Sequence, residues 1–283
     1  MARQTVGNQD SRGTATGAET EMRALRSDKL AKFVRYVKVA SARLRQGDMA
    51  PLTRYLPTYL PPRHIRRIRA QYRNSLAMSL RQWLEYHQRD LAFDQCTWMG
   101  VKAWKNPLDA WIYQEIVYEV RPEVIVEVGS AMGGGTLYLA HLLDLLGVGT
   151  VVSVDIDRTR FVAEHQRIVT VTGNSSSPEV VGQVAELCRD KRVLVIHDAD
   201  HRKPQVLEDL RAYAPMVSVG SYLIVEDGVV DLFRPHDLLG VPYVGPLAAS
   251  EEFLRDWPQF EVDLDRERYL LTYNPRGFLR RVR

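Results

Sequence analysis

The sequence predicts an α/β fold: a doubly wound parallel sheet with an antiparallel hairpin added near the C-terminus. In the second half of the chain, short apolar runs alternate with segments of helical periodicity, which is typical of parallel strands joined by helices. The first apolar run breaks into glycines, and four of the five runs end in a carboxylate. Ligands bind beyond the carboxyl ends of the strands in such sheets, so the same pattern indicates where a site should lie.

The individual elements follow from these patterns. Strands are expected at 124–128, 150–154, 167–172, 193–197 and 221–225, and helices at 136–146, 178–189 and 204–213. A further helix should begin near Asn106 or Asp109, either of which can cap it, and lead into the first strand. The chain closes with an apolar run at 269–273, an Asn-Pro-Arg-Gly turn at 274–277 and a second run from Phe278. This predicts a hairpin at the sheet edge, a feature of the Rossmann-like sheet of class I methyltransferases.

Composition limits the class of protein. The chain has 283 residues, of which 45% are hydrophobic and 26% charged, near the average for globular proteins. It can form one substantial core and an accessory region, and we expect a soluble, cytoplasmic protein. Cys96 and Cys188 lie far apart and match no metal spacing, so reduced thiols are expected. The net charge of +3 is too small to indicate nucleic acid as a partner, and we expect none.

Three regions follow from the distribution of polar and basic residues. Residues 1–21 are polar and lack an apolar stretch, so we expect a disordered tail that is neither a signal peptide nor a membrane span. Residues 22–93 are a basic extension of amphipathic helices, and residues 94–283 are the main domain. The basic run at 63–73 could contact phosphate, an anionic membrane or an acidic partner, but a solvated helix face is the simpler interpretation. We expect a homo-oligomer with at most peripheral membrane contact.

The loop after the first strand is a candidate ligand-binding loop, because glycines let backbone N–H groups approach a nucleoside-bearing ligand. Its candidate residues are Glu127, Gly129, Ser130, Gly133 and Gly134. The glycines alone are a weak signal. Asp155 strengthens it, since it ends the next strand 28 residues after Glu127 and can accept hydrogen bonds from both ribose hydroxyls. Together these residues predict an adenosyl pocket.

An aromatic segment precedes the first strand, with Trp98, Trp104 and Trp111 within 14 residues. Tryptophans at this density more often belong to a core than to a cofactor site. The functional alternative is that Trp98 and Gly100 fold over the ligand as a lid.

Acidic residues follow two later strands. Asp198, Glu226 and Asp227 are hard oxygen donors, and no cysteine lies near them in the sequence, so they favour Mg²⁺, Mn²⁺ or Ca²⁺ over zinc or copper. Singly, each residue could be a helix cap or part of a solvated loop. Three carboxylates on neighbouring strand ends beside an adenosyl pocket favour a metal site.

Histidines flank the first of these carboxylates. His201 lies three residues after Asp198, and a neutral imidazole there could remove a proton from a hydroxyl that a cation has acidified. Asp200 could orient His201 or be a spare ligand. His197 lies inside an apolar run, so we expect a packed, hydrogen-bonded histidine.

The chain resembles a known family over residues 97–280. The similarity rests on Trp98-Met-Gly100, Trp104-Lys105, Trp111-x-Tyr113-Gln-Glu115, the loop from Glu127 to Gly134, Asp198-x-Asp200-His201, Gly220-x-Tyr222 to Asp227, and Pro275 to Leu279. As a set, these motifs resemble the cephalosporin hydroxylase and rhamnosyl O-methyltransferase family, which is also similar to macrolide sugar O-methyltransferases. The basic extension matches nothing in it.

The resemblance implies S-adenosylmethionine as the methyl donor and Mg²⁺ as the metal. It places Gly129 and the following loop at the methionine part, Asp155 at the ribose, and Asn174 and Ser175 beside the adenine. The metal ligands would be Asp198, Glu226 and Asp227, with His201 as the base. Gly135 stands where the family often has a small hydroxyl residue, which puts one cofactor contact in doubt.

These observations lead to methyl transfer onto a deoxysugar hydroxyl, such as that of a rhamnosyl group, on a glycolipid or a glycosylated natural product. The alternative acceptor is a catechol or another vicinal diol. A hydroxylase component is a weaker alternative, because no two-histidine-one-carboxylate iron site is visible. A non-catalytic scaffold that works through its basic extension is a further alternative.

Overall fold

The computed structural model describes residues 41, 45, 77–92, 95–233 and 244–283. The chain divides into two compact units, Met1–Met78 and Ser79–Arg283, and the second contains nearly all of the described residues. The predicted tail and most of the basic extension lie outside the described residues. Within the described part of the chain, no helix is both long and apolar enough to cross a membrane.

The second unit is built on a seven-stranded sheet with the order β5-β4-β3-β6-β7-β9-β8. Its strands are β3 (Val124–Val128), β4 (Thr150–Asp155), β5 (Ile168–Thr172), β6 (Val193–His197), β7 (Tyr222–Val225), β8 (Phe260–Val262) and β9 (Phe278–Arg281). Strands β3 to β7 pair in parallel, whereas β9 is antiparallel to both β7 and β8. The predicted doubly wound sheet is therefore confirmed, and its strand order reverses at β3.

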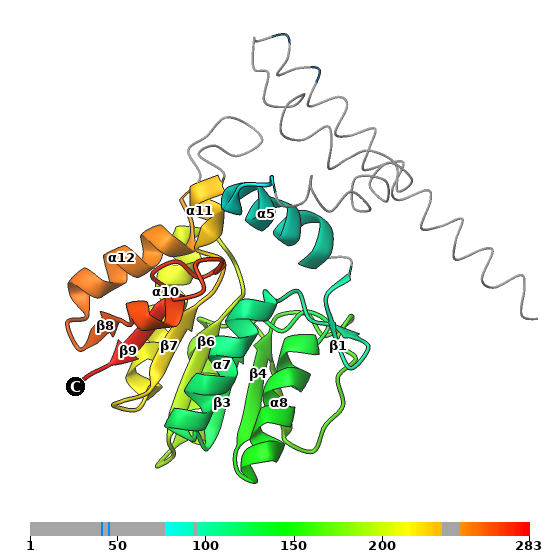
Figure 1. Ribbon diagram of the computed structural model, residues 1–283. Coiled ribbons are helices and arrows are strands. Elements are labelled where there is room, and N and C mark those ends of the chain that lie inside the picture. Colours follow the sequence, from blue (N-terminus) through cyan, green and yellow to red (C-terminus); the bar gives the residue numbers. More distant parts are fainter. Residues whose placement is uncertain (1–40, 42–44, 46–76, 93–94, 234–243) are drawn as a thin grey trace, which may run out of the picture. The chain divides into compact units, whose positions relative to one another are not determined.

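Helices cover both faces of the sheet (Figure 1). They are α7 (Pro107–Val120) and α8 (Gly134–Leu146) on one face, and α9 (Pro178–Cys188), α10 (Lys203–Tyr213) and α12 (Pro246–Asp256) on the other. Successive strand residues point to opposite faces, so Ile125 packs with the first pair and Val126 with the second group. The inner strands β3, β4, β6 and β7 are therefore buried on both sides, as parallel strands require, whereas the edge strand β5 is largely exposed.

The C-terminal antiparallel pair exists, but its first strand is β8 and not the predicted run at 269–273. That run is held by side chains at the start of α7: Asp109 accepts hydrogen bonds from the Thr272 hydroxyl (2.6 Å) and from the Tyr273 N–H (2.7 Å). The Tyr273 N–H thus bonds to a side chain, and the N–H groups of Leu270 and Leu271 bond to nearby carbonyl groups, so 269–273 does not join the strand ladder. The pattern also missed α12, the short α11 (Val229–Phe233) and a small hairpin of β1 (Thr97–Trp98) and β2 (Val101–Lys102).

A short helical element begins the second unit. Helix α5 (Leu80–Tyr86) starts with a capping box made by Ser79 and Gln82 and continues as a π-helix, His87–Ala92. The His87 ring stacks on Trp83 at 4.7 Å, and its Nδ1 lies 2.5 Å from the Tyr273 hydroxyl. The contact with Tyr273 fastens the element to the loop before β9.

Candidate active site

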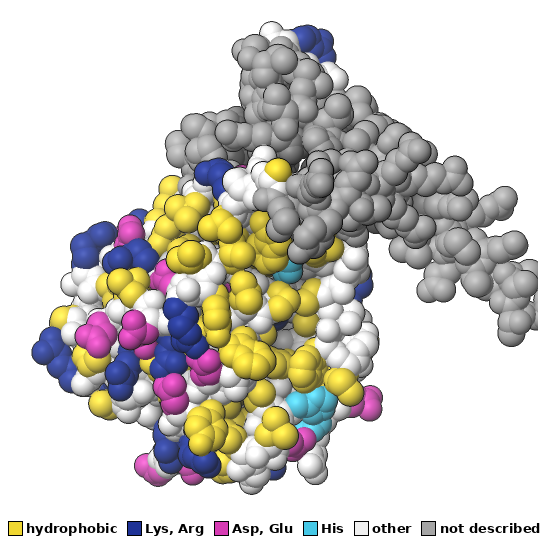
Figure 2. Space-filling view, viewed as in Figure 1, with side chains coloured by type: hydrophobic (Ala, Val, Ile, Leu, Met, Phe, Trp, Pro, Cys, Tyr) yellow, Lys and Arg dark blue, Asp and Glu magenta, His cyan; other side chains and the backbone are white. Residues whose placement is uncertain are grey.

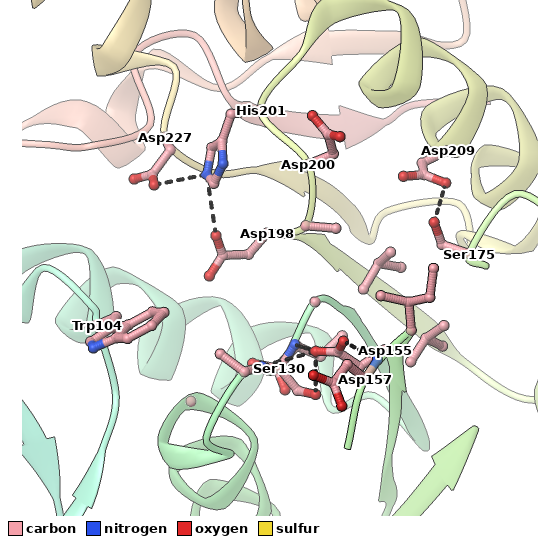
Figure 3. Close-up of a pocket in the computed structure, with 18 of the residues that line it drawn as sticks. Trp104, Ser130, Asp155, Asp157, Ser175, Asp198, Asp200, His201, Asp209 and Asp227 are labelled. Atoms are coloured by element: carbon pink, nitrogen blue, oxygen red, sulfur yellow. Dashed lines mark hydrogen bonds and ion pairs between the residues drawn. The ribbon is translucent and has the colours of Figure 1, made fainter. Parts of the chain in front are cut away.

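A cavity of about 550 Å³ opens where β3, β4, β6 and β7 end (Figure 3). This is the edge at which the strand order reverses, where ligands bind in open α/β sheets. The segment 102–105 before α7 forms another part of its wall, together with Gln88 and Ala92 of the π-helix and Tyr273.

Two glycines let neighbouring backbone segments approach one another closely at this edge. Gly129 follows β3 with a φ of 89°, and a Cβ there would lie 2.0 Å from the carbonyl oxygen of Asp198. A Cβ at Gly134 would lie 2.2 Å from the carbonyl oxygen of Lys102. Both positions therefore exclude side chains. Gly129 and Ser130 line the cavity, whereas Gly133 and Gly134 shape the loop behind its wall.

Asp155 ends β4 and lines the cavity. Its Oδ2 accepts hydrogen bonds from the N–H groups of Ser130 (2.9 Å) and Ala131 (3.0 Å), and its Oδ1 accepts one from the Asp157 N–H (3.0 Å). Burial alone would raise the pKa of Asp155, but these three backbone groups hold it below its usual value. Asp155 is therefore an ionised carboxylate that braces the glycine loop, and its contact with a ribose stays a prediction.

Arg158 is a further support of this loop that the sequence patterns did not indicate. Its guanidinium donates to the Ser130 hydroxyl (2.7 Å) and to the carbonyl oxygen of Val171 in β5 (2.9 Å). It thus ties the loop after β3 to a strand two places away in the sheet. The sequence could not indicate this role, because a backbone carbonyl leaves no sequence pattern and the fold alone brings Ser130 and Val171 close to Arg158.

Three predicted site residues converge at the other end of the cavity (Figure 3). His201 Nε2 lies 2.9 Å from Asp227 Oδ2 and 3.8 Å from Asp198 Oδ1, and a ligand atom from each of the three lies within 4.8 Å of the others. Burial opposes a charge on His201, but the hydrogen bond and charge of Asp227, aided by Asp198, raise its pKa to about 9. Without a cation, His201 is therefore an imidazolium paired with Asp227.

Glu226 lies on the inner side of this cluster and faces Lys105, which was not among the predicted site residues. Lys105 Nζ lies 2.6 Å from both Glu226 Oε1 and Asp198 Oδ2. Burial opposes the ammonium charge, but the carboxylates of Asp198 and Glu226 raise the pKa of Lys105 well above its usual value. The sequence places Lys105 121 residues from Glu226, so spacing alone could not reveal the pair.

Glu127 also lies on the inner side and is only 1% exposed. It accepts a hydrogen bond from Thr136, and burial raises the pKa of Glu127 to about 7 in spite of the nearby Lys105. A Cβ at Gly135 would lie 2.7 Å from Glu127 Oε1 and 2.9 Å from Lys105 Cε. The glycine at 135, where the resemblance led us to expect a hydroxyl residue, leaves room for this pair.

Asn174 and Ser175 follow β5 and line the cavity. The Ser175 hydroxyl donates to Asp209 Oδ1 (2.7 Å), and Asp209 Oδ2 lies 2.9 Å from His197 Nε2. Both His197 and Asp209 are buried. His197 is therefore a packed, hydrogen-bonded residue, as the sequence indicated, and it supports this loop through Asp209.

Asp200, whose role the sequence left open, accepts hydrogen bonds from the N–H (2.7 Å) and Nε (3.0 Å) of Arg202. Its pKa lies below the usual value, mainly because of the Arg202 side chain. Asp200 is not part of the close group formed by Asp198, His201 and Asp227.

The two predicted lid residues lie away from the cavity wall as the described residues define it. The indole N–H of Trp98 donates to His141 Nδ1 (2.9 Å), and its ring meets the edge of Tyr138 at 4.9 Å. Gly100 forms the turn between β1 and β2. The aromatic residues that line the cavity are Trp104 and Tyr273. Trp104 (Figure 3) has a positive φ of 48°, the kind of backbone strain found at functional sites.

Fold and site together define a class of protein. A parallel sheet that reverses at its first strand, an antiparallel last strand, a glycine loop and an acidic residue at the end of the second strand are features of class I methyltransferases. The chain belongs to the family described as Rhamnosyl O-methyltransferase/CmcI, whose model matches residues 91–282. The resemblance is therefore confirmed, and the protein is an O-methyltransferase.

Relatives support this placement. The chain is 32% identical over 205 residues to a rhamnosyl O-methyltransferase of Mycobacterium leprae (strain TN) and 30% identical over 206 residues to one of Mycobacterium bovis (strain BCG / Pasteur 1173P2). These matches cover 69% of this chain and 88% and 83% of the relatives. A solved structure of CmcI with Mg-SAM shares the fold, with a TM-score of 0.53 and 23% identity over 72% of this chain and 85% of that one.

Proposed function

We propose that the protein transfers a methyl group from S-adenosylmethionine to a hydroxyl of a deoxysugar, with the help of Mg²⁺. The observation that carries this proposal is one cavity with two unlike ends: a braced glycine loop at Asp155 and a cluster of Asp198, His201 and Asp227. A nucleoside-bearing donor fits the first end, and a hydroxyl acceptor fits the second. The rhamnosyl O-methyltransferase relatives favour a rhamnosyl group, carried by a glycolipid or a glycosylated natural product.

The cofactor would lie along the glycine loop. Gly129 and Ser130 would face its methionine part, Asp155 its ribose, and Asn174 and Ser175 its adenine. All five line the cavity. The ionised state of Asp155 supports its proposed contact with the ribose, because a carboxylate can accept hydrogen bonds from two ribose hydroxyls.

The acidic cluster suits a divalent cation. Asp198 and Asp227 offer hard oxygen ligands close to one another, as Mg²⁺ prefers. Glu226 would become a third ligand only if its carboxylate gave up its contact with Lys105. When bound, Mg²⁺ lowers the pKa of a hydroxyl that coordinates it.

His201 would act as the base, because its Nε2 faces the same point as the carboxylates of Asp198 and Asp227. It can take a proton only as a neutral imidazole. Positive charge must therefore first offset the two carboxylates, which raise the pKa of His201. The acceptor oxygen then forms a bond to the methyl carbon, the bond from carbon to sulfur breaks, and the hydroxyl proton passes to His201. No covalent enzyme intermediate is needed, and positioning supplies much of the rate.

Transfer of a radiolabelled methyl group from S-adenosylmethionine tests this proposal. The acceptors are rhamnosylated compounds and, for comparison, catechols, each with Mg²⁺ and with a chelator. We expect label on the rhamnosylated compounds in the presence of Mg²⁺. Labelling of catechols alone would replace the acceptor class, and equal labelling in the chelator would remove the metal from the reaction.

We further propose that the protein works in the cytoplasm as a homo-oligomer. Helix α7 presents Trp111 and Tyr118 with 59% and 63% of their surface exposed, and Figure 2 shows hydrophobic side chains on the face of the second unit that α7 occupies. Size-exclusion chromatography of the full chain and of its Trp111→Lys variant tests self-association through this helix, which predicts a smaller species for the variant.

A further inference from the structure

We propose that Lys105 is an internal cation that competes with the divalent ion for the carboxylates of Asp198 and Glu226 and so sets the affinity of the site for that ion. The inference rests on the metal site of the proposed function. It concerns the inner side of that site, which the sequence patterns did not show.

The geometry assigns Lys105 to both carboxylates at once. Its Nζ lies 2.6 Å from Asp198 Oδ2 and 2.6 Å from Glu226 Oε1, and the side chains of Lys105 and Glu226 are 11% and 6% exposed. The other oxygen of Asp198, Oδ1, faces His201. Asp198 therefore shares its two oxygens between the ammonium on the inner side and the cluster on the cavity side.

The charges around Lys105 explain why a cation is needed there. Glu226, Asp198 and Glu127 all act on its ammonium, and both glutamates are almost completely buried. Carboxylates this close repel one another, and buried charges without partners strongly destabilise a fold. The ammonium balances them when no ion is bound. An ion that takes Asp198 Oδ2 or Glu226 must therefore displace it.

The surroundings of Lys105 limit how far it can move aside. The next residue, Asn106, caps α7 by accepting a hydrogen bond from the Leu108 N–H (3.1 Å). At the other end of the side chain, a Cβ at Gly135 would lie only 2.9 Å from Lys105 Cε. With its backbone fixed and its side chain confined, the ammonium stays near the carboxylates and continues to compete.

The test is Mn²⁺ binding, measured by electron paramagnetic resonance on the full chain without cofactor or acceptor. Removing the competing charge in Lys105→Met should tighten Mn²⁺ binding by about tenfold or more, since each carboxylate loses a close buried partner. Lys105→Arg, which keeps a positive charge, should tighten Mn²⁺ binding far less than the neutral variant does. Lys191→Met is the matched control, because Lys191 is exposed just before the start of β6, at the opposite edge of the sheet, and should not alter binding.

A second measurement uses thermal unfolding. Lys105→Met should melt below wild type in a chelator, and saturating Mn²⁺ should reduce that difference. If the methionine variant does not fold, Lys105→Gln replaces it. Failure of both neutral variants to fold even with saturating Mn²⁺ would contradict the proposal, because the ion should substitute for the missing charge.

The outcomes separate this inference from the proposed function. Unchanged or weaker Mn²⁺ binding by a folded neutral variant, beside clear binding by wild type, overturns the role of Lys105 alone. Absence of Mn²⁺ binding by wild type and by both neutral variants overturns the metal site itself. Tighter Mn²⁺ binding by the neutral variants than by wild type, with Lys191→Met unchanged, supports both the role of Lys105 and the metal site.

Discussion

The two ends of the cavity are held together in different ways. At the glycine loop, Asp155 binds backbone N–H groups of Ser130 and Ala131, which lie 25 and 24 residues away in the sequence. At the acidic end, Lys105 binds side chains of Asp198 and Glu226, 93 and 121 residues away. The first end depends on backbone geometry, and the second on balanced charges. Substitutions and ions should therefore affect the two ends separately.

The largest effect is expected for His201→Ala. Loss of a general base typically slows turnover by about 10²–10⁴-fold, whereas binding of S-adenosylmethionine at the glycine loop should not change. Methyl-transfer rates and calorimetric binding check the two parts. His165→Ala is the control, because His165 pairs with Asp144 and does not line the cavity. Unchanged turnover in His201→Ala would remove this residue as the base.

Asp198→Asn should weaken Mg²⁺ binding by about a hundredfold, because it removes a charged ligand from the cluster. Activity should then depend strongly on added metal, while S-adenosylmethionine binding stays near that of wild type. Titration of activity with Mg²⁺ measures this. Asp200→Asn provides the comparison, since Asp200 binds Arg202 and should be tolerated. Wild-type activity of Asp198→Asn in a chelator would mean that the metal site is wrong.

Asp155→Asn should weaken cofactor binding and leave metal binding unchanged, the reverse of Asp198→Asn. Its amide lacks the charge that strengthens the bonds from Ser130 and Ala131, so S-adenosylmethionine should bind about tenfold more weakly, a loss of about 1.4 kcal/mol. Mn²⁺ affinity at the other end should be unaffected. A change in Mn²⁺ affinity with unchanged cofactor binding would contradict the separation of the two ends.

The smallest expected effect concerns Asp109, which joins α7 to the segment before β9. Burial raises its pKa from 3.8 to about 7, against hydrogen bonds from Thr272 and Tyr273. Because the folded state holds the proton more tightly than the unfolded state, this carboxyl favours folding most at low pH and loses that contribution as the pH rises from about 4 to 7. Urea unfolding of wild type and Asp109→Asn across this range should show the shallower pH slope in the variant. Equal slopes would contradict the assignment.

Much of the fold could be predicted from the sequence, because buried parallel strands read as apolar runs and helices α7 and α9 begin at the side-chain caps Asn106 and Ser177. The five parallel strands begin and end within about a residue of the expected positions. The run at 269–273 was misassigned because its backbone bonds to Asp109 of α7, to Val229 and to carbonyl groups of its own turn, which local patterns cannot show. Helix α12 was missed because the proline-containing sequence before it shows no clear periodicity.

Residues of the candidate site could be predicted from the sequence only where they lie at the ends of strands. Asp155, Asp198 and Asp227 lie at strand ends or within two residues of them, so the topology placed them at one edge. Lys105 and Arg158 were missed, because each acts through partners that only the folded sheet brings close. The lid role of Trp98 and Gly100 is untested, and the structure places Trp104 on the cavity wall instead.

Calorimetric binding of S-adenosylmethionine to the purified chain, with and without Mg²⁺, tests the central claim most directly. We predict micromolar binding in both conditions, since the glycine loop is braced by Asp155 and does not depend on the ion at the other end. Absence of binding in both conditions would contradict the assignment as an S-adenosylmethionine-dependent methyltransferase.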